Sequence, residues 1–76
     1  RLTEKGEHVI LTGSHPEGKD LTLYIFDDQN ELVFKDDLSK DAQVKKTYNL
    51  EKVISKGVTF MIYHEESLLT LESFEL

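Results

Sequence analysis

Short runs in which apolar and polar residues alternate recur along the chain, and polar turn residues separate them. Alternation with a period of two is typical of β-strands. Runs of this kind predict strands at residues 8–12, 21–27, 32–35, 43–50, 58–64 and 68–76. The polar stretch 1–7 predicts a frayed lead-in. Only residues 50–57 hint at helix, and we expect a single helical turn there, closed by Gly57 with a positive φ.

The stretch 21–34 predicts a β-hairpin, because the apolar runs 21–26 and 32–34 flank the polar residues 27–31. Its turn needs a residue that tolerates a positive φ. Asn30 is the best candidate, since its short polar side chain relieves the left-handed conformation. A hairpin alone is marginally stable in water. The remaining segments must therefore supply the strands that cover it.

Several strands separated by turn signals, without an ordinary helix, predict an all-β fold: a small antiparallel β-sandwich of about six to seven strands. A small barrel is the alternative architecture. We expect a single domain over residues 1–76. The lysines of the run 43–50 are typical of an edge strand that avoids pairing with other molecules. The run 68–76 changes its alternation, which predicts a bulge near Glu72 and Ser73.

The two most apolar strands, 21–27 and 58–64, carry large apolar side chains on both faces. A strand that is wet on one side should show polar residues there, so both faces are expected to be covered. One face is aliphatic. The other carries Tyr24, Phe26, Met61 and Tyr63, residue types that are enriched where proteins meet partners. These four are candidates for a binding patch if the strands are neighbours; the alternative is that they form the core.

Composition argues against nucleic-acid binding, membrane insertion and thiol chemistry. Acidic residues outnumber basic ones, 15 to 9, for a net charge of −6, which repels nucleic acid. No apolar run approaches the roughly 20 residues that span a bilayer, so we expect no membrane insertion. There is no cysteine, so disulfides and thiolate chemistry are excluded. Because the chain begins at Arg1 and not at Met, we expect a processed product or an excised piece.

Oxygen-bearing side chains cluster in the hairpin turn, at Asp27, Asp28, Asn30 and Glu31. Ca²⁺ prefers such ligands, so these residues are weak candidates for a metal site. They lack the alternating acidic loop with a glycine turn and a distal Glu that marks a calcium hand. Ordinary turn chemistry, in which Asx side chains accept hydrogen bonds from nearby backbone N–H groups, explains the same residues.

The histidines do not show the spacing of a zinc site. His8, His15 and His64 would share a metal only if the fold brought them together, and scattered surface histidines are the simpler interpretation. Ser14, His15 and Ser67 come without an orienting carboxylate or a glycine elbow. We assign no catalytic residue and no cofactor, and we do not expect an enzyme.

The order of features along the chain resembles small immunoglobulin-like β-sandwich modules of secreted and envelope proteins in Bacteroidetes-type bacteria. The layout is similar to C-terminal sorting domains of the type IX secretion pathway and to the immunoglobulin-like domain of hook-capping proteins. The resemblance rests on LTLYIFDDQNELVF at 21–34, YNL at 48–50, KGVTFMIY at 56–63 and FEL at 74–76. It implies a non-catalytic module in a secreted, periplasmic or cell-surface setting.

These observations lead to two expectations of function. The first is an extracellular or envelope module for binding or spacing, which recognises a protein partner or a second copy through the aromatic patch or an edge strand. The alternative is a secretion-targeting domain of the C-terminal sorting type that docks onto export machinery.

Overall fold

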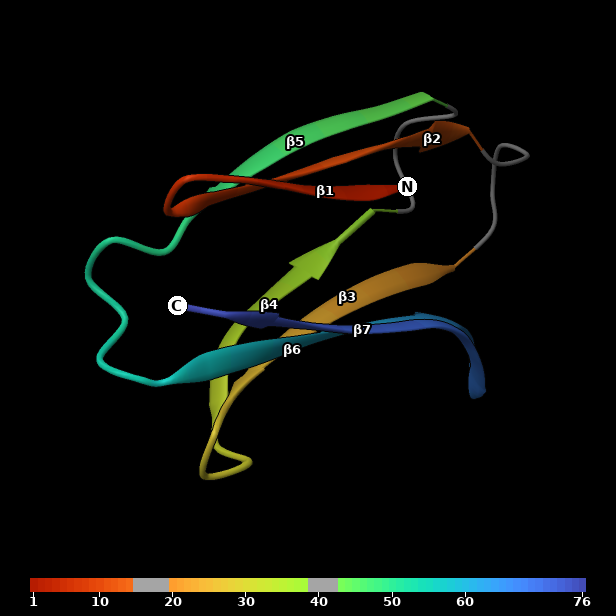
Figure 1. Cartoon of the computed structure of the whole chain (residues 1–76). Coiled ribbons are helices and arrows are strands. Elements are labelled where there is room, and N and C mark those ends of the chain that lie inside the picture. The colour runs from red at the N-terminus through yellow and green to blue at the C-terminus, as the bar shows by residue number, and fades with distance from the viewer. Residues whose placement is uncertain (15–19, 39–42) are drawn as a thin grey trace.

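The computed structural model describes residues 1–14, 20–38 and 43–76. In these residues the chain forms an antiparallel β-sandwich, with β1, β2 and β5 in one sheet and β4, β3, β6 and β7, in that order, in the other (Figure 1). The strands are β1 (Leu2–Lys5), β2 (His8–Ser14), β3 (Leu21–Asp27), β4 (Leu32–Asp37), β5 (Gln43–Asn49), β6 (Gly57–His64) and β7 (Ser67–Glu75). The predicted all-β sandwich is confirmed. The described residues contain no helix that is long and apolar enough to cross a membrane.

The predicted hairpin is β3 and β4, and β6 lies on the other side of β3. Asn30 has a φ of 61°, which confirms the predicted left-handed turn residue. The backbone N–H of Asp27 donates to the carbonyl of Glu31 at 2.9 Å and closes the turn. β3 is therefore a central strand, paired along its length with β6.

The core lies between the sheets, and the mostly aliphatic face of β3 and β6 forms one side of it. Leu23 and Phe60 have no exposed surface, and Ile25 has almost none. The three-stranded sheet supplies the opposing layer, with Val9 and Tyr48 among its buried residues. The interpretation in which the aromatic face is the core is therefore wrong. Both faces are apolar in the sequence, and only the position of the second sheet decides between them.

The first residues are a strand and not the frayed lead-in expected at 1–7. β1 pairs with β2 through a turn that contains Gly6 at a φ of 60°. Leu2 is buried opposite Leu11. A single apolar residue fixes this strand, because burying one leucine side chain stabilises the fold by about 1.5–3 kcal/mol. One residue is too little to show a strand period in the sequence.

The link between β5 and β6 contains the expected single turn, in which the N–H of Val53 donates to the carbonyl of Leu50. Its end differs from expectation. Gly57 begins β6 without a positive φ. Its constraint is space, since a Cβ there would lie 2.9 Å from the carbonyl oxygen of Phe74. The glycine lets β7 approach β6 closely at their end.

Two strand details need correction. β4 continues through Asp36 and Asp37, beyond the predicted strand at 32–35, which ended there because acidic residues are also typical of a loop. The irregularity of β7 lies at Leu69, between the partners of Ile62 and Tyr63, and not near Glu72 and Ser73. The predicted edge strand is confirmed: β5 is the last strand of its sheet, and its lysines are on it.

Candidate functional site

The four aromatic and methionine residues predicted as a patch lie together on the outer face of the four-stranded sheet. Tyr24 is directly opposite Met61 in the pairing of β3 and β6. The rings of Tyr24 and Phe26 are stacked, with centroids 6.2 Å apart. Tyr24 and Tyr63 meet edge to face at 5.7 Å, with an angle of 84° between the rings. We call Tyr24, Phe26, Met61 and Tyr63 the outer patch; all four are half-buried.

The outer patch lines a shallow hollow of about 400 Å³ whose remaining walls are Glu65 and Glu66. These glutamates form the turn between β6 and β7, where Glu65 has a φ of 56°. Both are exposed. The sequence did not indicate them as site residues, because two glutamates in a turn are typical of an ordinary loop. Their position two and three residues after Tyr63 was the only available signal.

Apolar surface continues from the outer patch to β7. In the pairing of β6 and β7, Leu71 is opposite Met61 and Leu68 is opposite Tyr63. Residues directly opposite in an antiparallel pair share a face, so these leucines extend the patch sideways. They are 52% and 46% exposed. On the other side, the Nζ atom of Lys35 lies 5.7 Å from the ring centroid of Tyr24.

This surface combines ring faces, which attract cations, with carboxylates at one end. Tyr63 donates a hydrogen bond through its hydroxyl to the sulfur of Met61 at 4.0 Å, which orients both side chains. Apolar contact supplies affinity, and the few polar groups at the rim supply orientation. The arrangement suits recognition of a partner.

The acidic hairpin turn uses its carboxylates on the protein's own backbone. Asp27 Oδ1 accepts hydrogen bonds from the N–H groups of Gln29 at 2.8 Å and Glu31 at 2.9 Å. Asp28 donates its N–H to the hydroxyl of Ser55 at 3.1 Å, which ties the turn to the link before β6. These contacts are those expected of turn chemistry at the weak metal candidates. Among residues 1–14, 20–38 and 43–76, no group of three or more His, Cys, Asp or Glu could hold a metal ion.

The described histidines lie on different sheets, His8 on β2 and His64 on β6. The structure does not bring them into one group with acidic residues. His15 lies outside the described residues.

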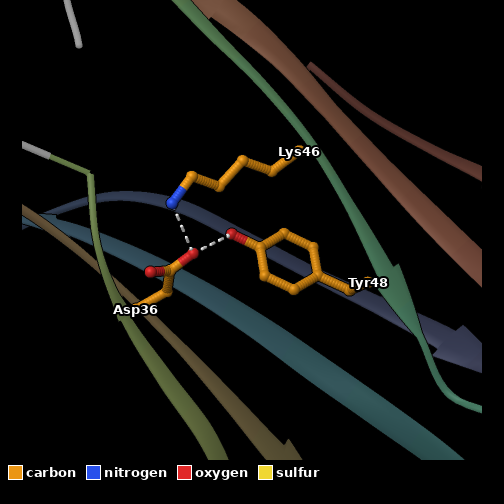
Figure 2. A network of polar contacts seen from close by, with 3 residues as sticks. All are labelled: Asp36, Lys46 and Tyr48. Carbon is orange, nitrogen blue, oxygen red and sulfur yellow. Dashed lines mark hydrogen bonds and ion pairs between the residues drawn. The ribbon is translucent and has the colours of Figure 1, made fainter.

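A polar cluster joins the two sheets, as Figure 2 shows. Asp36 of β4 accepts two hydrogen bonds on the same oxygen, from Lys46 Nζ at 3.0 Å and from the Tyr48 hydroxyl at 2.9 Å, both on β5. Burial, the hydrogen bond to Asp36 and the charge of Asp36, in that order, raise the pKa of Tyr48. A phenol held in its neutral form is a donor and not a base. The cluster therefore fastens β4 to β5.

The raised pKa of Tyr48 predicts loss of stability in alkali. In the unfolded chain tyrosine ionises near pH 10, whereas folded Tyr48 keeps its proton at higher pH. The stabilisation is therefore complete below about pH 10 and falls as pH rises further, by at most about 1.4 kcal/mol per pH unit. Urea unfolding at pH 8 to 11 measures the slope. Tyr48→Phe should flatten it, and equal slopes in the two proteins would contradict the assignment to Tyr48.

Comparisons with protein-family models, with curated proteins and with solved structures found no match to this chain.

Proposed function

We propose that this chain is a non-catalytic module that binds a protein partner through the outer face of its four-stranded sheet. The setting proposed with it is extracellular or the cell envelope, as the resemblance described above implies. Spacing between other parts of a larger assembly is the accompanying role, because it needs only the folded sandwich.

One observation carries the proposal: an aromatic and methionine cluster lies on the sheet face that points away from the core. The core itself is complete without it, because Leu23, Ile25 and Phe60 are already buried among the residues between the two sheets. Tyr24, Met61 and the neighbouring Leu71 are therefore not needed to close the sandwich. Large apolar side chains that the core does not use are typical of contact surfaces.

The surrounding residues support recognition of a polypeptide over a small molecule. The hollow is shallow and borders exposed leucines on β7. Small-molecule sites are commonly concave and enclose most of the ligand, whereas an open apolar surface with a polar rim is the form of a protein interface. The net charge of −6 adds a preference for basic partners.

Selection from a displayed library of random peptides tests the proposal. Wild-type protein serves as bait, and the Met61→Lys variant serves in the counter-selection, because a lysine at the centre of the outer patch places an unpaired charge in the contact. We expect the enriched peptides to bind wild type at least about tenfold more tightly than the variant, a difference of about 1.4 kcal/mol.

Ile54→Lys is the matched control. It makes the same kind of change at a side chain that is fully exposed, in the link before β6, so binding should equal that of wild type. Equal melting temperatures of the three proteins would show that folding is unchanged. If no peptide is enriched, or if enriched peptides bind Met61→Lys as well as wild type, the binding role of the outer patch is refuted and spacing remains.

A further inference from the structure

Among the strands that the structure describes, none pairs with the outer side of β7, which is an edge of the four-stranded sheet. It is the last strand in the order β4, β3, β6, β7. With nine residues it is also the longest strand described. An edge strand presents unpaired backbone N–H and C=O groups, which form a template for another strand.

Lysine and proline, which commonly protect an edge strand, are missing from β7, and its only charged residues are Glu72 and Glu75. Exposed leucines lie along it at positions 68, 69 and 71, with 46%, 58% and 52% of their surfaces exposed. Its sequence, SLLTLESFE, holds no lysine, arginine or proline. The other edges differ: β5 and β4 carry lysines, and β1 has only four residues. Edge strands that carry lysine, or that are very short, resist pairing, so β7 is the edge best suited to accept a strand, above all a basic one.

The regular part of β7 is long enough to pair with an added strand. Its irregularity at Leu69 leaves residues 70–75 in one-to-one register with β6, from Ile62 to Gly57. A peptide of about six residues would span this part at roughly 3.3 Å per residue. Alternate side chains of an added strand would lie beside Leu71 on the outer face and so enlarge the outer patch.

Charge points to the chemistry of the partner. Residues 65–76, which form the turn before β7 and β7 itself, contain four glutamates and no basic residue. A second copy that paired β7 with β7 would bring four more carboxylates to the same place, and each copy carries a net charge of −6. Like charges in close opposition are unfavourable, whereas lysine or arginine would complement this edge.

We propose that an extended, basic segment of a partner protein, with apolar residues at alternate positions, adds to β7 as a fifth strand of the sheet. The inference rests on the proposed function and names its partner class and its mode of binding. Main-chain hydrogen bonds to β7 supply affinity, contact with Leu71 and the outer patch supplies side-chain selectivity, and the glutamates favour a basic sequence.

A defined peptide tests the proposal. The probe is the acetylated heptapeptide Lys-Val-Thr-Val-Lys-Val-Thr with an amidated end, titrated into isotopically labelled protein while backbone amide signals are followed by NMR. We expect saturable shifts across residues 70–75. A peptide with glutamate in place of both lysines should bind at least about tenfold more weakly, as should one that is N-methylated at alternate residues and cannot pair along one side.

Variants of the protein give the second arm. Leu71→Lys places a protective lysine on the edge and should weaken binding by about tenfold, or about 1.4 kcal/mol. Ile54→Lys, with the same change in charge away from the sheet, should bind like wild type. The N-methylated peptide keeps the test valid even if Leu71→Lys disturbs folding.

The remaining outcomes overturn the inference in distinguishable ways. Shifts confined to the outer patch, with β7 amides unchanged, would refute strand addition and leave the proposed function standing. If the N-methylated peptide bound as tightly as the unmodified peptide, strand addition would likewise be refuted. If the glutamate peptide bound as tightly as the lysine peptide, the preference for a basic partner would be refuted. Dimerisation through β7 in sedimentation, without peptide, would make a second copy the occupant. Absence of any shift would refute addition of a basic strand.

Discussion

Replacing Phe60 with alanine is expected to lower the free energy of unfolding by about 3–5 kcal/mol. Phe60 has no exposed surface. Its ring lies between those of Tyr48, at 5.8 Å, and Phe74, at 5.6 Å, and so links β5, β6 and β7. Removing it leaves a cavity where three strands meet. Chemical denaturation monitored by tyrosine fluorescence measures the loss.

The size of the domain makes this loss severe. Typical stabilities of about 0.05–0.15 kcal/mol per residue give roughly 4–11 kcal/mol for a chain of this length. The Phe60→Ala variant should therefore lose at least about a quarter of the free energy of unfolding, and at the lower end of this range it would be unfolded at room temperature. Phe34→Ala is the matched control, because Phe34 also contacts Tyr48, at 6.0 Å, but is 47% exposed. Equal losses in the two variants would contradict a core centred on Phe60.

Replacing Gly57 with alanine is expected to destabilise the fold by about 1–3 kcal/mol. The added Cβ would lie 2.9 Å from the carbonyl oxygen of Phe74, which is backbone and cannot rotate away. The ends of β6 and β7 must therefore separate. Hydrogen exchange should show faster exchange in β7 near Phe74, together with a lower denaturation midpoint.

Gly13→Ala is the control for this substitution. A Cβ at Gly13 would have its nearest neighbour at 3.9 Å, the backbone nitrogen of Arg1, which is ordinary contact. We expect no loss there, and a gain of about 0.4–1 kcal/mol is consistent with reduced freedom of the unfolded chain. If both substitutions lower the free energy of unfolding by the same amount, then the role of Gly57 is not to leave room for the carbonyl of Phe74.

Apolar runs bounded by turn residues were enough to predict the central strands. Residues 58–64 form such a run, and β6 occupies nearly the same range. The core face could not be predicted in the same way, because β3 and β6 carry large apolar groups on both sides. The opposing sheet decides which face is buried, and its position depends on contacts between residues far apart in the chain.

The missed features have similar causes. β1 depends on one buried leucine, Leu2, and on its pairing with β2. The acidic residues around Asp36 are typical of a loop, yet Asp36 belongs to a strand, where it accepts hydrogen bonds from two side chains of β5. Glu65 and Glu66 become part of the candidate site only when the turn that contains them closes beside the outer patch. Each feature depends on tertiary contact and leaves little trace in local sequence.

The placement of β1 and β7 has a mechanical consequence for a spacing role. These terminal strands belong to different sheets, and the two chain ends lie at opposite ends of the sandwich (Figure 1). Tension applied between the ends therefore acts along the strands, so that β1 slides against β2 and β7 slides against β6. Hydrogen bonds of antiparallel strands are perpendicular to that direction, so the whole set carries the load together and the strands do not peel apart one bond at a time.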